Sequence, residues 1–314
     1  MEDGWDQLDT LRLILASTVA VGHAVGIFAQ PFGYVSDWIN DLFSWASASA
    51  VLVFFLISGL AIGRSLTRLR ESNDALFPVF MWHRFLRLYP PLLFSVALCV
   101  ALAIILRSLG LEQHTGAADV VRTSFSYLDN LSDVAIALIT FGFRGGLTGS
   151  SNGPLWSLAL EMQAYVLAGL IVQIWTTRSW WIKIISTFGL VVALRKRGVA
   201  DLDLYHSSCF ALFLLGLFLS QAQPKFPRLL PTIKIDFSYS LYILHFPLML
   251  FVFFLSCQAK PDLLLAWLLV ANSLACSFVV AIVSGLTLER ARFFFRSTYL
   301  TSTSWGFRKK PTAT

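Results

Sequence analysis

LRLILASTVAVGHAVGIF, residues 11–28, is an almost unbroken apolar run that holds one basic residue, Arg12, and one histidine, His23. A helix that crosses a membrane needs roughly 20 mostly apolar residues. Comparable runs recur at 42–63, 91–109, 156–176, 180–194, 204–221, 237–256 and 263–287. Because these runs are continuous rather than alternating, they favour helices over the strands of a membrane barrel. The sequence therefore predicts an all-α fold, a polytopic transmembrane helical bundle of about eight to ten spans.

The composition agrees with a lipid environment. Of the 314 residues, 56% are hydrophobic and 13% are charged, whereas soluble domains are about 25% charged. The net charge of +6 does not indicate a nucleic-acid partner, because the basic residues gather in short segments between apolar runs. That distribution is typical of cytoplasmic loops. The basic segments are Arg64 to Arg87, Lys225 to Lys234, and the tail that follows Arg290.

With eight crossings, both termini and these basic segments are expected on the cytoplasmic side of the membrane. The cluster Arg195, Lys196 and Arg197 would then lie outside, so a ninth or tenth crossing stays open. A weaker apolar stretch at 131–143 is too short to span comfortably and is expected to form a half-helix or a packed loop. The long polar region 110–155 is expected on the non-cytoplasmic side, where it could cover or help to form an acceptor site.

No internal repeat divides the chain. We expect one membrane-embedded domain at residues 1–296 and a polar, basic cytoplasmic tail at 297–314. The four cysteines fall in apolar segments and show neither a CxxC pair nor a Cys/His ligand spacing, so no metal site is predicted.

His23 is a costly residue for a membrane helix. It follows Arg12 by eleven residues, which places it about 16 Å deeper along a helix with a rise of about 1.5 Å per residue. A neutral imidazole at that depth suits general-base chemistry or nucleophilic attack. The alternative is a structural histidine that bonds a backbone carbonyl between packed helices, and the position alone leaves both open.

Glu161 poses the same question in the run GPLWSLALEMQAY, residues 153–165. An ionisable residue within a membrane is a functional candidate by default, but a carboxylate can also pin its helix to a neighbour. Trp156, Ser157 and Gln163 enter the bilayer with it, and they make a purely structural role less attractive.

Arg84 and Arg87 lie in WHRFLRLYPPLL, residues 82–93, just before a span that the two prolines are expected to help to start. Spaced three apart, they project from one face of a helical turn. Guanidinium forks suit bidentate binding of phosphate, while ordinary anchoring at the cytoplasmic interface is the alternative.

Five segments in order resemble the membrane-bound acyltransferase family 3, whose members transfer acyl groups to hydroxyls of cell-surface carbohydrates. The resemblance extends from Leu8 to about Arg292, where LERARFFFR is similar to the family's final Glu-containing segment. Departures are Met162, where the family often has a second Glu, and Ala164, where it has an aromatic residue. The five segments are LDTLRLILASTVAVGH, VFFLISGLAIGRSL, HRFLRLYPPLL, LWSLALEMQAY and FSYSLYILHFPL.

The resemblance implies a role for each candidate. His23 would be the essential base or a transient acyl carrier, and Glu161 would support the same site. Arg84 and Arg87, with Arg12, would hold the phosphates of an acyl-CoA, although an Asp9–Arg12 pair at helical spacing is the alternative for Arg12. The supporting residues would be Trp156, Ser157, Gln163, Tyr165 and His245, the last of which also has a structural explanation.

The resemblance further implies that acetyl-CoA or another acyl-CoA is a co-substrate that arrives from the cytoplasm, with no tightly bound cofactor. The carbohydrate acceptor would enter from the non-cytoplasmic side of a bacterial inner membrane. Two alternatives stay open. The acceptor could be a macrolide, a lipid or another small metabolite, or the protein could be a proton-coupled transporter, since buried His and Glu also serve proton relays. The transporter is less favoured because the chain lacks the repeated halves typical of that class.

Overall fold

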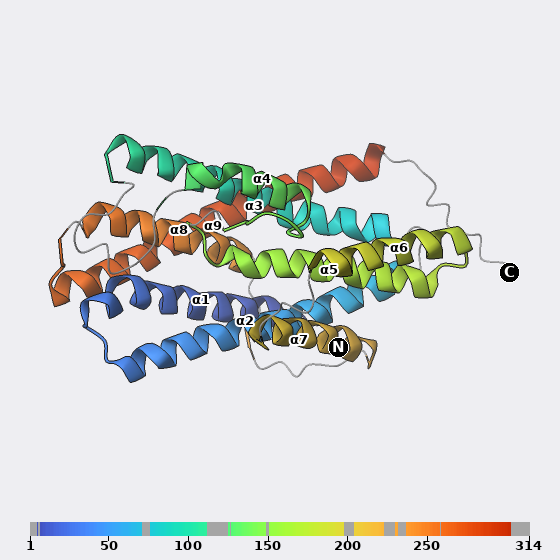
Figure 1. Cartoon of the computed structure of the whole chain (residues 1–314), viewed down its shortest axis with the longest axis horizontal. Coiled ribbons are helices and arrows are strands. Elements are labelled where there is room, and N and C mark those ends of the chain that lie inside the picture. The colour runs from blue at the N-terminus through green and yellow to red at the C-terminus, as the bar shows by residue number, and fades with distance from the viewer. Residues whose placement is uncertain are drawn as a thin grey trace.

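A computed structural model describes residues 5, 7–70, 76–111, 125, 127–148, 151–197, 204–222, 230–231, 237–257 and 259–302. For residues 70, 193–197 and 288–302 it describes the backbone alone. Every regular element within these ranges is a helix, which confirms the all-α prediction (Figure 1). The long elements are α1 (Gln7–Phe28), α2 (Asp37–Arg70), α3 (Leu76–Ser108), α5 (Leu155–Thr176), α6 (Trp180–Arg197), α7 (Leu204–Leu219), α8 (Ser238–Ser256) and α9 (Leu263–Ser302). The short ones are η1 (Gln30–Phe32), η3 (Tyr127–Asn130), α4 (Leu131–Ile139) and η5 (Ser220–Ala222).

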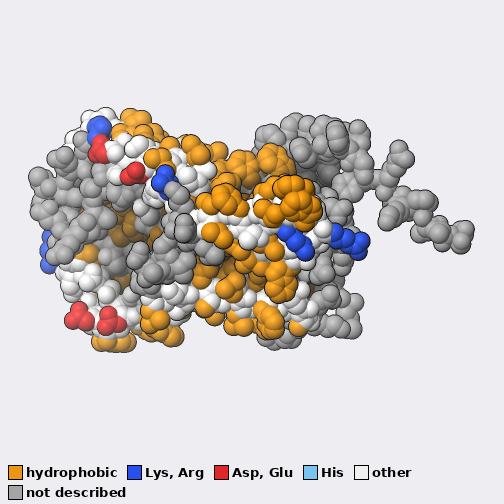
Figure 2. Space-filling view, turned by 45° about the vertical axis from the view of Figure 1, so that its right-hand side comes forward, with side chains coloured by type: hydrophobic (Ala, Val, Ile, Leu, Met, Phe, Trp, Pro, Cys, Tyr) orange, Lys and Arg blue, Asp and Glu red, His pale blue; other side chains and the backbone are white. Residues whose placement is uncertain are grey.

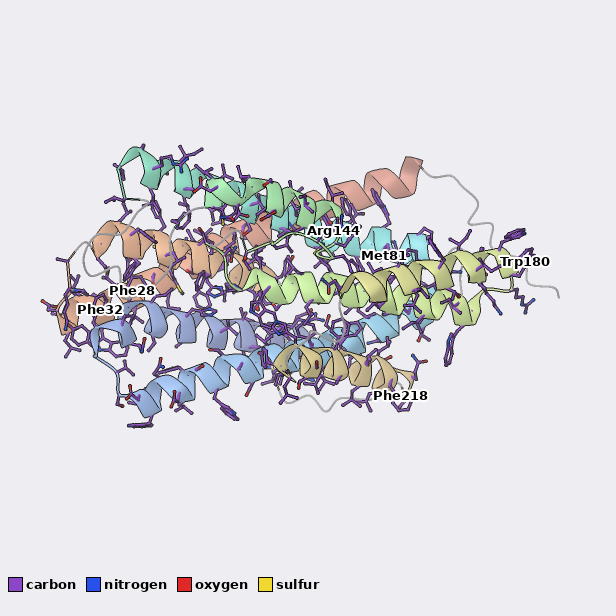
Figure 3. The ribbon with its side chains drawn as sticks, viewed as in Figure 1. Phe28, Phe32, Met81, Arg144, Trp180 and Phe218 are labelled. Atoms are coloured by element: carbon purple, nitrogen blue, oxygen red, sulfur yellow. The ribbon has the colours of Figure 1, made fainter. Side chains whose placement is uncertain are left out.

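The helices lie side by side along one long axis but do not all share the same half of it. In Figure 1, α1 and α8 occupy one half, α5, α6 and α7 occupy the other, and α2, α3 and α9 run through both. Figure 3 places Phe28 and Phe32 at one end of the molecule and Trp180 at the opposite end. The three long helices therefore connect two groups of shorter ones, and functional side chains of both groups can meet near the middle.

Within the described residues, seven helices are long and apolar enough to cross a membrane, one fewer than the eight spans expected. The difference is the run at 180–194. It forms α6, whose apolar part ends at Val192 and is shorter than a full span. Large hydrophobic side chains are exposed along α6 and α7, among them Ile185, Phe188 and Phe218. Figure 2 shows apolar side chains over much of one face, as expected for a surface that contacts lipid.

The expectation that a span begins at the proline pair is wrong. Helix α3 starts at Leu76 and continues through Pro90 and Pro91. Membrane helices tolerate such prolines because neighbouring groups can bond the freed carbonyls. Arg84 and Arg87 consequently belong to the helix itself and not to a loop, and their side chains are fixed by helix packing.

Helices α2 and α7 pack closely against each other through glycine. A Cβ on Gly59 would lie 2.0 Å from the carbonyl oxygen of Phe213, and one on Gly216 would lie 2.2 Å from that of Leu56. Gly59 and Gly63 form a GxxxG pattern, which lets helix backbones pack closely in membranes. This contact holds Ser58 at a fixed position on α2.

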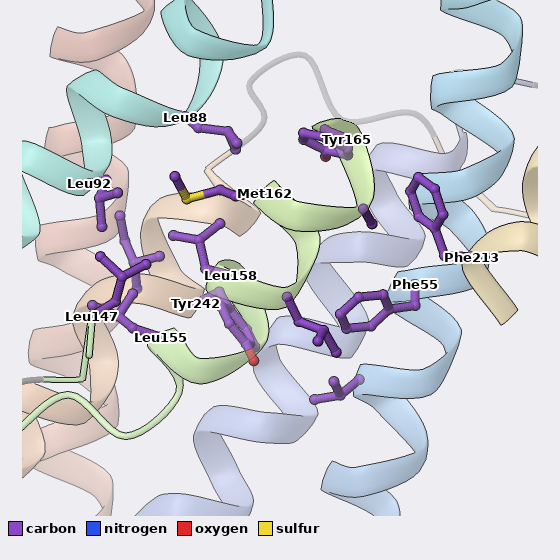
Figure 4. Packing of buried hydrophobic residues seen from close by; sticks show 14 of the residues in the cluster. Phe55, Leu88, Leu92, Leu147, Leu155, Leu158, Met162, Tyr165, Phe213 and Tyr242 are labelled. Carbon is purple, nitrogen blue, oxygen red and sulfur yellow. The ribbon is translucent and has the colours of Figure 1, made fainter. Parts of the chain in front are cut away.

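Helix α5 lies at the centre of the core. Figure 4 shows Leu158 and Met162 among Leu88 and Leu92 of α3, and Tyr165 toward Phe213 of α7. All of these side chains belong to one cluster of buried hydrophobic residues. Because α5 is packed on several sides, its polar residues Ser157, Glu161 and Tyr165 are held within the protein and away from lipid.

Other expectations have mixed outcomes. The short run at 131–143 contains the nine-residue helix α4, as a half-helix would. The boundary proposed at residue 296 falls inside α9, which continues to Ser302. The rest of the proposed tail, the basic segment from Lys225 to Arg228 with Lys234, and most of 110–124 lie outside the described residues.

Candidate active site

A cavity of about 70 Å³ lies where α1, α2, α3, α5 and α8 meet. We call it the arginine cavity, because three guanidinium groups and one carboxylate line it. Its apolar wall includes Phe54 and Leu158. Its polar lining consists of Arg12, Ser58, Arg84, Arg87, Ser157, Glu161, Tyr165, Ser238, Tyr239 and Tyr242. The excess of positive charge suits an anionic ligand.

Arg84 is held firmly but keeps donor capacity. Its terminal nitrogen donates to Ser65 Oγ at 2.8 Å, and its guanidinium lies over the rings of Phe80 and Tyr165 at 5.4 and 5.9 Å from their centroids. Such cation–π contacts hold the plane of the guanidinium. Among the residues that the structure describes, the buried Nε of Arg84 has no hydrogen-bond partner. A buried donor without a partner is costly, so this nitrogen is suited to an incoming acceptor.

Arg12 lies between Asp9 and the arginine cavity. It lines the arginine cavity, and its guanidinium also pairs with Asp9 at 2.8 Å, one helical turn earlier. The two explanations that the sequence left open for Arg12 are therefore compatible.

Glu161 lines the arginine cavity. Ser58 donates to its carboxylate at 2.5 Å, and Tyr165, one turn further along α5, donates to the same oxygen. Within the described part of the chain, the hydrogen bonds of Glu161 go to these two hydroxyls and none goes to His23. That Glu161 and His23 serve one site stays a prediction.

Tyr242 stands where the arginine cavity approaches the histidines. Its hydroxyl lies 2.6 Å from Ser157 Oγ, and both residues line the cavity. On its other side, the Tyr242 ring packs on His245 with a centroid distance of 6.1 Å. Phe54 meets the Tyr242 ring at 5.6 Å. Tyr242 therefore forms the wall between the cavity and His245.

His23 and His245 form a hydrogen-bonded pair between α1 and α8. His23 Nδ1 lies 2.8 Å from His245 Nε2, with ring centroids 5.1 Å apart and planes only 13° apart. The nitrogen contact is shorter than stacked rings can approach, so the two rings meet edge to edge in nearly one plane. His245 is fully buried, whereas His23 is partly exposed. His23 is thus the more exposed member of the pair.

The remaining candidates take separate positions. Ser157 and Tyr165 line the cavity. Gln163 donates to the carbonyl of Gly142 at 2.5 Å and so ties α5 to the loop after α4. Trp156 packs on His206 of α7 with a centroid distance of 4.7 Å. These last two hold α5 in place and do not face the cavity.

Sequence reasoning missed Ser58 and Tyr242. Both lie inside segments that carried the family resemblance, Ser58 in LISGL and Tyr242 three residues before His245. A polar side chain within an apolar run was the available signal, but Ser and Tyr are common in membrane helices and neither is ionised. The structure also shows that no group of three or more His, Cys, Asp or Glu within the described residues could hold a metal.

Comparisons with known proteins supply the chemistry. The chain is 31% identical over 169 residues to an O-acetyl transferase of Shigella phage Sf6, across 52% of this chain and 45% of that protein. It is 28% identical over 181 residues to Nodulation protein 10 of Rhizobium leguminosarum bv. viciae, across 56% of this chain and 46% of that protein. The chain thus matches less than half the length of either relative. No solved structure matches it.

A family model described as an acyltransferase domain matches residues 5–235, which is most of the chain and includes His23, Arg84, Arg87 and Glu161. The chain belongs to the membrane-bound acyltransferase family 3.

Proposed function

We propose that this protein transfers an acetyl group from acetyl-CoA, supplied from the cytoplasm, to a hydroxyl of a cell-surface carbohydrate. The proposal rests on two neighbouring features, the positively charged arginine cavity and the pair of His23 and His245, which are separated by the ring of Tyr242. The printed name of the phage relative, an O-acetyl transferase, supports acetyl as the group transferred.

The arginine cavity holds the donor. Arg84, Arg87 and Arg12 bind the phosphates of CoA, and the buried Nε of Arg84 supplies a donor that is otherwise unpaired. Planar guanidinium groups suit phosphate oxygens better than ammonium groups do. The acyl end of the donor extends along the cavity toward Ser157 and Tyr242.

His23 is the general base. The acceptor hydroxyl approaches the exposed side of His23, and His23 Nε2 removes its proton as the oxygen attacks the thioester carbon. The new C–O bond forms and the C–S bond breaks. The leaving CoA thiolate then takes the proton from the imidazolium, so free CoA departs and His23 returns to its neutral form. For the acceptor oxygen to reach the thioester carbon, the ring of Tyr242 has to move aside, because it lies between the cavity and His245.

Glu161 acts on the donor side. It fixes Ser58 and Tyr165 by hydrogen bonds, and Tyr165 in turn lies against the guanidinium of Arg84. We assign Glu161 the task of holding the wall of the arginine cavity and placing Arg84.

The test uses inverted membrane vesicles from bacteria that produce the protein, supplied with acetyl-CoA labelled in the acetyl group. Base-labile label is expected to appear in the carbohydrate fraction, and His23→Ala vesicles with the same amount of protein should lack it. Label that appears only in lipids or small metabolites would overturn the carbohydrate acceptor. No transfer from acetyl-CoA by the unmodified protein would overturn the donor.

A further inference from the structure

The pair of histidines is built with a fixed direction of hydrogen bonding. His245 Nδ1 lies 3.0 Å from the carbonyl oxygen of Leu241, one turn earlier on α8. A carbonyl oxygen can only accept, so the hydrogen of this bond sits on His245 Nδ1. In a neutral imidazole the other nitrogen is then an acceptor. His245 Nε2 therefore accepts a hydrogen bond.

The partner of that acceptor is His23 Nδ1, at 2.8 Å. Since His245 Nε2 accepts, His23 Nδ1 must donate, and the single hydrogen of a neutral His23 is fixed at this position. His23 Nε2 is left with a free lone pair. The chain of bonds from Leu241 through His245 to His23 thus selects the tautomer that a general base at Nε2 requires.

The helix around His245 is fixed by polar contacts from outside it. Pro247 has no N–H, so the carbonyl of Ile243, four residues earlier, lacks its helical partner. Ser95 Oγ donates to this carbonyl at 3.0 Å, and Asn152 Nδ2 donates to it at 2.9 Å. These groups from α3 and from the turn before α5 hold α8 within one turn of His245. The position of His245 relative to His23 therefore depends on three segments of the chain: α8, α3 and the turn before α5.

Burial of His245 separates its role from that of His23. It is fully buried, it does not line the arginine cavity, and its polar contacts go to His23 and to the backbone. It cannot touch donor or acceptor. As His23 gains a proton at Nε2, however, the bond to His245 stabilises the imidazolium from behind.

We propose that His245 is the positioning residue of the active site, which fixes the tautomer and plane of His23 and stabilises its protonated form. This inference rests on the proposed function, in which His23 is the base. It assigns to a buried side chain the task that an acidic residue performs behind the histidine of a hydrolase triad.

Two amide substitutions separate the bonds that His245 makes. His245→Gln places its side-chain oxygen near the position of Nε2, so it can still accept from His23 Nδ1. His245→Asn can reach the backbone of Leu241 but is too short to reach His23. We expect Gln to keep the acetyl-transfer kcat within about tenfold of the unmodified protein and Asn to lower it by about 10²-fold or more, the range of general-base assistance. The KM for acetyl-CoA should stay unchanged in both.

A matched control is Leu250→Ala, which opens space at a fully buried position of α8 away from the histidines. All variants are compared at equal amounts in vesicles with labelled acetyl-CoA, and their thermal unfolding is measured in detergent. Rescue by Gln over Asn supports the proposal. Equal activity of Gln and Asn, whether high or low, overturns it, as does a loss in Leu250→Ala as large as that in His245→Asn at equal unfolding temperature. Failure of the unmodified protein to use acetyl-CoA would instead overturn the proposed function.

Discussion

The arginine cavity and the histidine pair are built on opposite principles. The cavity gathers charge from three helices, with Arg84 and Arg87 on α3, Arg12 on α1 and Glu161 on α5. The pair uses two neutral rings and a backbone carbonyl, and its hydrogen bonds run in a single direction. Charge suits binding of a soluble anion, whereas neutrality suits a base that must accept a proton within the bilayer. If the proposed function holds, this difference predicts that mutations can disturb donor binding and proton transfer separately.

The largest effect is expected from His23→Ala. Removing the base should lower the kcat for acetyl transfer by about 10²–10⁴-fold, while acetyl-CoA binding stays unchanged because His23 does not line the arginine cavity. Steady-state transfer in vesicles measures the first quantity. Thr18→Val on the same helix, which removes only a bond to the backbone of Ile14, is the control and should keep full activity. A normal kcat in His23→Ala would contradict the assignment of His23 as the general base.

The next effect is expected from Arg84→Lys. A lysine keeps the charge but loses the fork, the bond to Ser65 and the contact with two rings. Loss of one charge-assisted bond costs about 1.5–3 kcal/mol, which corresponds to a rise in the acetyl-CoA KM of roughly 10- to 100-fold. The kcat at saturation should stay near that of the unmodified protein. An unchanged KM with a reduced kcat would contradict the assignment of Arg84 to acetyl-CoA binding.

Glu161→Gln tests the same division, because the family resemblance assigns Glu161 to the site of the base, while its side chain lines the arginine cavity. The amide retains the shape but weakens the bonds from Ser58 and Tyr165. We expect a loss of stability of about 1–3 kcal/mol and a higher acetyl-CoA KM, with a smaller fall in kcat than in His23→Ala. Glu161→Gln kinetics that match His23→Ala, with an unchanged KM, would restore Glu161 to the base site.

The smallest effect is expected from Asn152→Ala. It removes one of the two donors to the Ile243 carbonyl at the Pro247 break, which should cost about 1–3 kcal/mol of stability. Thermal unfolding in detergent measures it. Asn152→Asp, with the same shape but without the donor, should lose at least as much, and a fully stable Asp variant would show that the bond to Ile243 contributes nothing.

Much of the architecture could be predicted from the sequence, because membrane helices follow from the length of apolar runs. The predicted bundle of helices is confirmed. The predicted start of a span at Pro90 and Pro91 is wrong, because α3 continues through both prolines and a membrane helix can bond the freed carbonyls elsewhere. The sequence predicts a full membrane span at 180–194, whereas the apolar part of α6 is too short to cross a membrane. The length of an apolar run alone does not show where the helix that contains it begins and ends.

The site was less predictable, for a physical reason. His23, Arg84 and Glu161 could be singled out because charge and imidazole are costly in lipid. The sequence could not predict which of these residues lie together in space, because Glu161 and Arg84 lie on different helices whose relative depth is set by packing. The partnership of His23 with His245 joins residues 222 positions apart. Tyr242, an uncharged residue, became visible only as the wall between cavity and histidines.

The most direct test is equilibrium binding of acetyl-CoA to the purified protein, measured by titration calorimetry in lipid nanodiscs. The separation of the two regions predicts that His23→Ala binds acetyl-CoA with the same Kd as the unmodified protein. It predicts that an Arg84→Ala/Arg87→Ala double variant binds at least about tenfold more weakly, as expected when charge-assisted bonds to phosphate are lost. Binding of the double variant as tight as that of the unmodified protein would contradict the account.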